Sequence, residues 1–218
     1  MKKNLTELVF ILDRSGSMYG LENDTIGGFN SLLEKQKKEP GDAFVSTILF
    51  DDRIEVLHER VKVCEVEPIT CKDYYVRGNT ALLDAVGRSI SHIANIHKNA
   101  HGKDTPEHTL FVIITDGMEN ASRCYSLRQV REMIRCQKEK YGWEFLFLGA
   151  NINAIEAAGT LGISPEYAAN YHCDSVGTRL NYEVMNQAVA SFRSTATLDV
   201  HWKNAIEEDF QKRKKNRV

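Results

Sequence analysis

Short, unbroken apolar runs alternate along the chain with longer segments whose apolar residues follow helical spacing. Two of the runs, at residues 8–12 and 110–114, contain only Leu, Val, Phe and Ile. Runs of this length without helical spacing are typical of strands buried on both faces of a parallel sheet. After the first run, an apolar stripe at 26–33 predicts a helix that is capped by Asp24 and ended by Pro40-Gly41.

The rest of the pattern completes an alternation of strands and helices. The strands expected at 43–50 and 54–61 are separated only by Asp51-Asp52-Arg53, which predicts a β-hairpin and so one antiparallel strand at an edge of the sheet. Further helices are expected at 81–96, 126–140 (capped by Ser126), 152–161 and 180–192, and further strands at 145–148 and 168–173. This order predicts an α/β fold, with a doubly wound, mostly parallel sheet and helices on both faces.

The chain has 218 residues, of which 42% are hydrophobic, enough for one globular α/β domain. We assign this domain to residues 1–200 and treat 201–218 as a basic C-terminal segment. Within that segment Trp202, Ile206 and Phe210 recur at four-residue intervals ahead of a basic run at 212–217, which predicts an amphipathic helix. Docking of its apolar residues on the domain is favoured over a partner or nucleic-acid contact, because charge runs are weak motifs.

Polar side chains gather where the two fully apolar runs end. The first run leads into Asp13-Arg14-Ser15-Gly16-Ser17 and the second into Thr115-Asp116-Gly117. A third segment, Gly78-Asn79-Thr80, places a hydroxyl in a loop just before the helix at 81–96. In a doubly wound sheet, ligands collect outside the carboxyl ends of the strands where strand order reverses, and two such strands side by side would bring Asp13 and Asp116 together. Hard oxygen donors of this kind favour Mg²⁺ or Mn²⁺ over zinc.

Each of the three segments also has an ordinary structural interpretation. Ser15 and Ser17 can cap a turn, Thr80 can be a helix N-cap, and Asp116 can belong to an Asp-Gly turn. Together these interpretations require three independent coincidences at consistent strand and helix boundaries. A metal site is therefore the favoured interpretation.

In this order and at these separations, the three segments resemble the metal-ion-dependent adhesion site of von Willebrand factor type A domains, over roughly the first three quarters of the chain. The resemblance implies that Asp13, Ser15, Ser17, Thr80 and Asp116 form the site, with the hydroxyls contacting the ion directly and one or both aspartates acting through water. It also implies a bacterial-type, intracellular stand-alone module with strand order 3-2-1-4-5-6 and strand 3 antiparallel. Asn79 departs from the pattern, since many relatives carry glycine there.

Charge and hydropathy narrow the class of protein. The formal net charge of −2 gives no electrostatic reason to expect nucleic acid as the main partner. No apolar stretch approaches the roughly 20 residues needed to cross a bilayer, and the run at 8–12 is too short for a signal peptide. Five cysteines without a Cys-x-x-Cys pair disfavour a disulfide framework and a structural zinc site. We therefore expect a cytoplasmic protein that does not bind membranes.

The chemistry of the five ligands favours binding over catalysis. Three neutral hydroxyls and two aspartates leave a bound divalent ion electrophilic, and the family resemblance implies that an Asp or Glu of a protein ligand completes its coordination. We therefore expect a non-enzymatic module that recruits an acidic protein partner through the ion. An AAA ATPase, a kinase or a phosphatase is a candidate for that partner.

Enzyme families with a similar first strand fit this chain poorly. A haloacid-dehalogenase phosphatase carries a second aspartate where this chain has Ser15, and the Gly-x-Ser-x-Gly elbow of an α/β-hydrolase does not match residues 14–18. A hydrolase also needs a general acid or base, and neither Glu119 nor Asp84 lies in a pattern specific enough for that role. The remaining alternative is a Mg²⁺-dependent phosphohydrolase that uses the same metal site.

Overall fold

The computed structural model describes residues 5–100 and 104–215. It contains a six-stranded sheet in the order β3-β2-β1-β4-β5-β6, in which β3 pairs antiparallel with β2 and the other pairings are parallel. The strands are β1 (Leu5–Asp13), β2 (Asp42–Phe50), β3 (Ile54–Lys62), β4 (His108–Thr115), β5 (Glu144–Gly149) and β6 (Ala168–Asn170). The predicted strand order and the antiparallel edge strand are confirmed. So short a connection between β2 and β3 can join only antiparallel neighbours.

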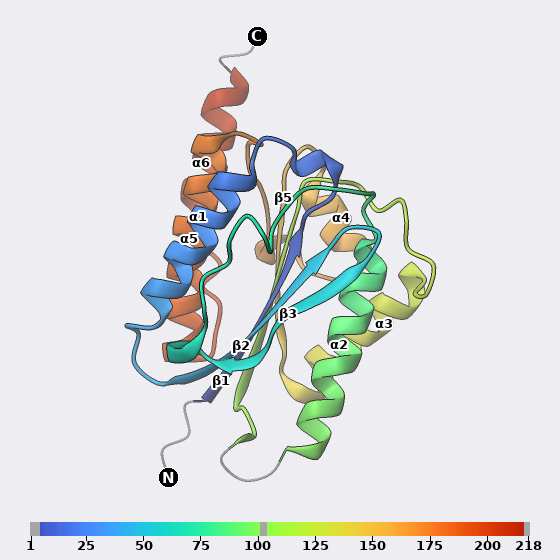
Figure 1. Cartoon of the computed structure of the whole chain (residues 1–218), viewed down its shortest axis with the longest axis vertical. Coiled ribbons are helices and arrows are strands. Elements are labelled where there is room, and N and C mark those ends of the chain that lie inside the picture. The colour runs from blue at the N-terminus through green and yellow to red at the C-terminus, as the bar shows by residue number, and fades with distance from the viewer. Residues whose placement is uncertain (1–4, 101–103, 216–218) are drawn as a thin grey trace.

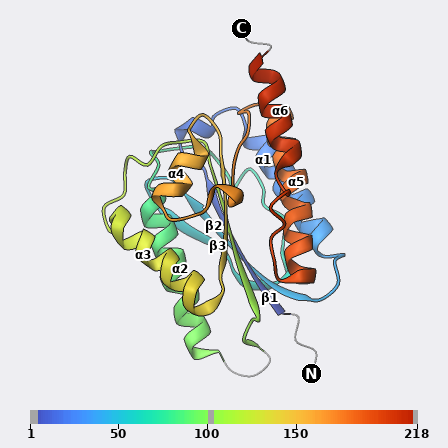
Figure 2. The same ribbon diagram turned by 180° about the vertical axis from the view of Figure 1, so that it is seen from behind.

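Helices cover both faces of the sheet, as predicted (Figures 1 and 2). One face carries α1 (Glu22–Gln36), α5 (Ser175–Thr195) and α6 (Asn204–Lys215), and the other carries α2 (Leu82–Asn99), α3 (Leu127–Tyr141) and α4 (Ala154–Thr160). Short 3-10 turns, η1 (Gly16–Met18), η2 (Val63–Glu65) and η4 (Pro165–Tyr167), complete the described elements.

β1 shows why an unbroken apolar run forms a central strand. Leu8, Phe10 and Leu12 join the apolar cluster on the α1 and α5 side of the sheet, whereas Val9 and Ile11 join the cluster on the α2 and α3 side. All five side chains are fully buried. Successive side chains of a strand point to opposite faces, so a strand that is covered on both faces is apolar at every position.

The starts of two helices show how capping sets an element boundary. Ser126 caps α3, as predicted, through a capping box with Gln129. The prediction that Asp24 caps α1 is wrong, since the helix already begins at Glu22 and Asp24 lies within its first turn. The helical hydrogen bonds start at Leu21, whose carbonyl accepts from the Thr25 N–H (2.8 Å), and no side chain of the described residues caps this end.

Two elements in the second half of the chain are shorter than their patterns predict. β6 ends at Asn170 instead of 173. Its neighbour β5 ends at Gly149, which pairs with Asn170, so no strand in the described part of the chain lies beside the residues that follow. α4 begins at Ala154 instead of 152, because Asn153 caps it by accepting a hydrogen bond from the Glu156 N–H.

The C-terminal segment forms a helix that packs on the domain. α6 begins at Asn204, later than predicted, and Ile206 is buried against the core. Before the helix, the Trp202 indole donates to the Glu166 carbonyl (2.8 Å), and within it the Phe210 ring stacks on His172 at 4.6 Å between centroids. Its last turns extend past the body of the molecule (Figure 1), and residues 216–218 lie outside the described residues. The domain boundary at residue 200 stays a prediction.

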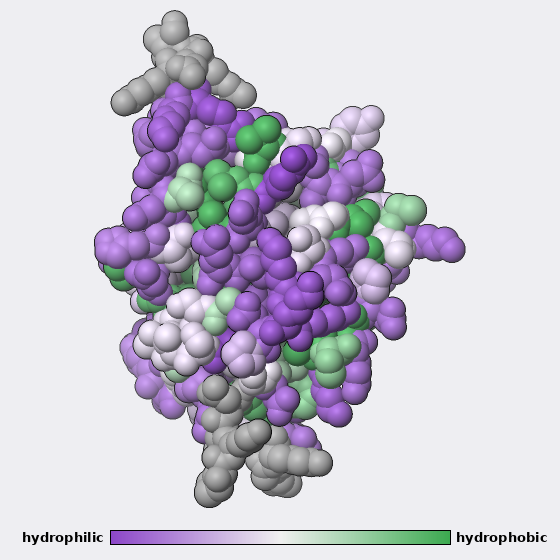
Figure 3. Space-filling view, turned by 90° about the vertical axis from the view of Figure 1, so that its left-hand side faces the viewer, coloured by the Kyte–Doolittle hydropathy of each residue, from purple (hydrophilic) through white to green (hydrophobic). Residues whose placement is uncertain are grey.

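The outer surface over α1, α5 and α6 is mainly hydrophilic, with apolar side chains in small scattered groups (Figure 3). This is the expected outer face of helices whose apolar stripes pack on a sheet. None of the helices that the structure describes is long and apolar enough to span a membrane.

Candidate metal centre

The five predicted ligands lie at the carboxyl ends of the central strands. β1 pairs with β2 on one side and with β4 on the other, so the strand order reverses at β1. Asp13 is the last residue of β1, and Asp116 directly follows β4. This is the topological switch point at which parallel sheets of this kind bind ligands.

The three hydroxyls converge on one another. The Ser15 and Ser17 Oγ atoms lie 3.0 Å apart, and the Thr80 hydroxyl donates to Ser15 Oγ at 2.9 Å. The Ser17 hydroxyl also acts to lower the pKa of Asp116, against the burial that raises it. Residues that are 65 positions apart in the chain thus present their oxygens to one point above the sheet.

Asp13 is buried below these hydroxyls. Its Oδ1 accepts a hydrogen bond from the Ser15 N–H (2.7 Å) and its Oδ2 accepts one from the Thr115 hydroxyl (2.6 Å). The pKa of Asp13 is raised to about 6, mainly by burial and to a smaller extent by the charge of nearby Asp116, against the lowering effect of these hydrogen bonds. The ionised carboxylate therefore lacks a compensating positive charge.

Asp116 is 2% exposed, and its Oδ1 has no hydrogen-bond partner among the described residues. The other oxygen accepts a long contact from the Cys173 thiol (3.4 Å). Burial raises the pKa of Asp116, and burial together with the Asp116 charge raises the pKa of Cys173 to about 11, so this thiol stays protonated. A buried carboxylate oxygen without a donor is costly unless a cation binds it.

Gly117 keeps the space between these oxygens open. A Cβ atom on this residue would lie 2.5 Å from Thr80 Oγ1 and 2.9 Å from Ser17 Oγ. Any larger residue would therefore push the hydroxyls out of position, which explains why glycine directly follows the second aspartate.

The donor set fits a hard divalent cation. It consists of two carboxylates and three hydroxyls, all oxygen, as Mg²⁺ and Mn²⁺ prefer. Among residues 5–100 and 104–215, no group of three or more His, Cys, Asp or Glu side chains is placed to hold a metal ion, so a site here depends on the hydroxyls. If bound, the ion would supply the positive charge that Asp13 and Asp116 lack and an open position for a further oxygen ligand.

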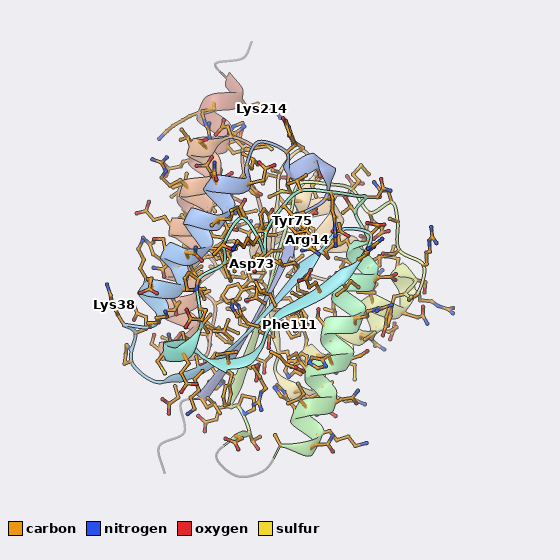
Figure 4. All side chains as sticks on the ribbon, in the orientation of Figure 1. Arg14, Lys38, Asp73, Tyr75, Phe111 and Lys214 are labelled. Carbon is orange, nitrogen blue, oxygen red and sulfur yellow. The ribbon has the colours of Figure 1, made fainter. Side chains whose placement is uncertain are left out.

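Arg14, between the predicted ligands Asp13 and Ser15, is fully buried and faces away from the carboxylate pair. Its guanidinium contacts Asp51 (Nε to Oδ2, 3.0 Å) and Glu55 (Nη2 to Oε2, 2.7 Å). It also donates to the Asp73 carbonyl (3.2 Å) and lies over the Tyr75 ring at 5.2 Å from the centroid (Figure 4). Arg14 thus ties the end of β1 to the β2–β3 hairpin and to the loop that leads to Thr80.

Further hydrogen bonds among these segments position the Thr80 loop. The Ala81 N–H donates to the Asp51 carbonyl (3.0 Å), and the Gly16 N–H donates to the Gly78 carbonyl (3.1 Å). Thr80 itself exchanges hydrogen bonds with Asn120, whose side chain accepts from the Thr80 N–H (3.0 Å). The unusual Asn79 does not disturb this arrangement, because the contacts run through its neighbours.

Four residues that the sequence interpretation left out of the site support it directly. Thr115 and Cys173 contact the two aspartates, the Tyr74 hydroxyl donates to the Asp13 carbonyl, and Arg14 anchors the loop. Thr115 carried a usable signal, since it is a hydroxyl residue at the end of an apolar run. Tyr74 and Cys173 lie in loops without a regular pattern, and only the fold brings them here.

Comparisons with known proteins rest on solved structures, because no protein-family model and no curated protein matches the chain. A von Willebrand factor type A structure from Catenulispora acidiphila matches with a TM-score of 0.55 and 12% identity, over 87% of this chain and 43% of that one. The sheet order and this match agree. The chain has the von Willebrand factor type A fold.

Two further solved structures, both of metal-bound proteins, are similar to this chain. Proximal thread matrix protein 1 from the mussel byssus, with a zinc-occupied adhesion-site motif, matches with a TM-score of 0.57 and 14% identity, over 85% of this chain and 46% of that one. The manganese-loaded TRAP protein of Plasmodium vivax matches with a TM-score of 0.57 and 17% identity, over 82% and 72%. The chain spans less than half the length of the byssus and Catenulispora chains.

Proposed function

We propose that the chain is a non-enzymatic module that binds Mg²⁺ or Mn²⁺ through Asp13, Ser15, Ser17, Thr80 and Asp116, and recruits a protein partner through that ion. The observation that carries this proposal is the pair of buried aspartates beside three convergent hydroxyls. Neither aspartate forms a salt bridge within the described part of the chain. The zinc and manganese of the byssus and TRAP structures support a divalent cation at such a site.

The partner would supply an Asp or Glu to the ion. Neutral hydroxyl ligands, with one or both aspartates acting through water as the family resemblance implies, leave the ion electrophilic, so it attracts a further carboxylate. Binding of the ion and of the partner must then strengthen each other by the same factor. An AAA ATPase, a kinase or a phosphatase stays a candidate for this partner, and the five free cysteines support a reducing compartment such as the cytoplasm.

Glu119 and Asp84, the two acids considered as a general acid or base, are already engaged in hydrogen bonds, which supports binding over catalysis. Glu119 accepts four hydrogen bonds, from the N–H groups of Leu83, Ala121 and Ser122 and from the Ser122 hydroxyl. Asp84 accepts three backbone N–H bonds from residues 123–125. Burial raises the pKa of Asp84, but these backbone bonds outweigh it and lower the pKa below its usual value. Neither acid is available as a general base.

Titration calorimetry with MgCl₂ and MnCl₂ tests the metal site. We expect binding of one ion, weakened about 10-fold or more by Asp13→Ala, Asp116→Ala or Thr80→Ala, in line with the loss of a ligand or its support. Asp199→Ala and Ser194→Ala, both at exposed positions, are the matched controls and should bind as the parent does. Unchanged binding by the Asp13→Ala, Asp116→Ala double variant would exclude this site.

Phosphoester hydrolysis tests the non-enzymatic part of the proposal. The metal-loaded protein should release no more phosphate from a panel of phosphomonoesters and phosphodiesters than buffer with the same ions. Turnover that disappears in Asp13→Asn would establish the phosphohydrolase alternative instead.

A further inference from the structure

An apolar groove lies beside the candidate metal centre. It is lined by residues of α4 and of the start of α2, two helices on the same face of the sheet (Figures 1 and 2). It has a volume of about 380 Å³. Its walls come from the start of α2, the loop after β4, the start of α3 and α4, and its apolar surface includes Leu83, Met118, Leu127, Ile152, Ala157 and Leu161.

The groove and the metal centre share a wall. Gly117 lines the groove, and a Cβ atom on it would lie 2.5 Å from Thr80 Oγ1 and 2.9 Å from Ser17 Oγ. Leu82, two residues after Thr80, lines the groove as well. A segment that places a carboxylate on the ion would therefore have its neighbouring residue over the groove.

Two apolar side chains at the groove are unusually open to solvent. Met118 is 74% exposed and Leu127 is 42% exposed. Exposed apolar residues that gather around a concave surface mark binding sites, and Met is common where a surface accepts different apolar side chains.

The acidic residues that line the groove disfavour the binding of a partner's carboxylate in the groove itself. Glu119 and Glu156 both line it, and the carboxylate of Glu119 is held in place by its four hydrogen bonds. A partner carboxylate is thus attracted by the ion and repelled by the groove, whereas an uncharged apolar side chain is accepted there. The two neighbouring surfaces select different residues of one segment.

We propose that the groove binds a large apolar side chain of the partner, such as Leu, Ile, Met or Phe, adjacent in sequence to the Asp or Glu that reaches the metal ion. This inference rests on the proposed function. It adds that the recognised element is a short segment of an acid next to an apolar residue, and not a lone carboxylate.

Peptide display tests this inference on the full chain. A library of random peptides is selected on the protein in MgCl₂ and eluted with EDTA, and synthetic peptides with the selected acid next to Leu or next to Ala are then compared by fluorescence anisotropy. We expect the Leu peptide to bind about 10-fold or more tightly, the effect of burying one large aliphatic side chain. Equal affinities of the two peptides, or a selection without Mg²⁺-dependent peptides, would overturn the inference.

Groove variants separate this inference from the proposed function. Met118→Ser with Leu127→Ser should reduce the affinity of the Leu peptide to that of the Ala peptide, without changing calorimetric Mg²⁺ binding. Val200→Ser, at a 48% exposed position, is the control. Intact Mg²⁺ binding and acid dependence with no effect of the groove variants would refute the groove alone. Equal peptide binding in EDTA would refute the metal-dependent function as well.

Self-association is the competing occupant of the groove. Light scattering of the Mg²⁺-loaded protein should give a monomer mass at the peptide-binding concentration. A dimer that the two groove substitutions convert to monomer would assign the groove to a second copy of the chain and overturn the peptide proposal.

Discussion

Asp13 and Arg14 are adjacent in the chain and equally buried, but their charges are compensated in different ways. Arg14 lies in a cluster of two arginines, Arg14 and Arg77, and two acids, Asp51 and Glu55, whose charges balance. Asp13 faces Asp116, a second acid, and both have raised pKa values because they are buried. One cluster is electrically complete within the protein, whereas the other has no positive charge beside it in the described part of the chain, and we propose that a cation compensates it.

Asp13 and Arg14 are similarly buried, and the clusters around them differ in whether their charges are compensated. A buried charge is tolerated when an opposite charge and hydrogen bonds compensate it. The balanced cluster therefore stabilises the fold by holding three segments together, and we propose that the unbalanced pair binds a ligand. The same short sequence, Asp13-Arg14-Ser15, contributes to both, since alternate residues at a strand end point to opposite sides.

Removal of Arg14 should have the largest effect on stability. Arg14→Met keeps the apolar stem but removes the fully buried guanidinium that contacts both Asp51 and Glu55, and we expect a loss of about 3 to 5 kcal/mol in the free energy of unfolding. Denaturant unfolding with circular dichroism measures it. Arg77→Met is the control: this side chain is 34% exposed, so about 1 kcal/mol is expected. Equal losses for the two variants would show that the balance of the cluster does not depend on Arg14.

Neutralisation of Asp13 should raise the free energy of unfolding, whereas removal of Arg14 lowers it, and the size of this gain should depend on pH. The folded-state pKa of about 6 lies above the usual 3.8, so the unfolded chain binds fewer protons and the metal-free protein loses stability as pH rises from about 4 to 7. Asp13→Asn lacks this loss. The free energy of unfolding of Asp13→Asn, relative to that of the parent, should therefore rise by on the order of 2 to 3 kcal/mol between pH 4 and pH 7.5.

The control for this pH series is Asp199→Asn, at an exposed position. Its free energy of unfolding should differ from that of the parent by the same amount at every pH. Unfolding curves are recorded in EDTA so that no cation contributes. A parent and an Asp13→Asn variant with parallel pH profiles would show that Asp13 carries no uncompensated charge.

A divalent cation should complete the unbalanced pair. At Mg²⁺ or Mn²⁺ concentrations 100-fold above the dissociation constant, we expect about 2.7 kcal/mol of added stability at pH 7.5. The gain should shrink below pH 6, because protons then compete for Asp13. Differential scanning calorimetry measures it, with Asp116→Asn as the variant that should lose most of the gain. Equal stabilisation of parent and variant would indicate binding elsewhere.

The sequence predicted the carboxylate pair better than the balanced cluster, for a physical reason. Asp13 and Asp116 end the two fully apolar runs, and parallel strands bring their carboxyl ends to the same edge. Arg14, Asp51 and Glu55 have no shared pattern, and their contact depends on how the hairpin after β2 curls over the end of β1. Strand order and the grouping of the five candidate ligands could thus be predicted.

The boundaries that were predicted wrongly have local causes. β6 stops where β5 stops, and a single sequence does not show the length of a neighbouring strand. α1 begins two residues before Asp24 because its helical hydrogen bonds already start at the Leu21 carbonyl, without a side-chain cap among the described residues. Thr115 lay within a predicted segment, but its role depends on the 2.6 Å contact with Asp13, across 102 residues of chain.

The smallest effect that still distinguishes the two clusters concerns Thr115. Its hydroxyl donates to Asp13 Oδ2, and a hydrogen bond to an ionised acceptor is worth more than one to a neutral acceptor. Thr115→Val should therefore cost about 1 kcal/mol more at pH 7.5, where Asp13 is ionised, than at pH 5, where it is mostly protonated. Unfolding in EDTA at both values measures this difference. Thr160→Val is the matched control, because its hydroxyl donates to the neutral Ala157 carbonyl and its effect should not change with pH. If the two variants respond to pH alike, the Thr115 hydroxyl does not stabilise a charged Asp13.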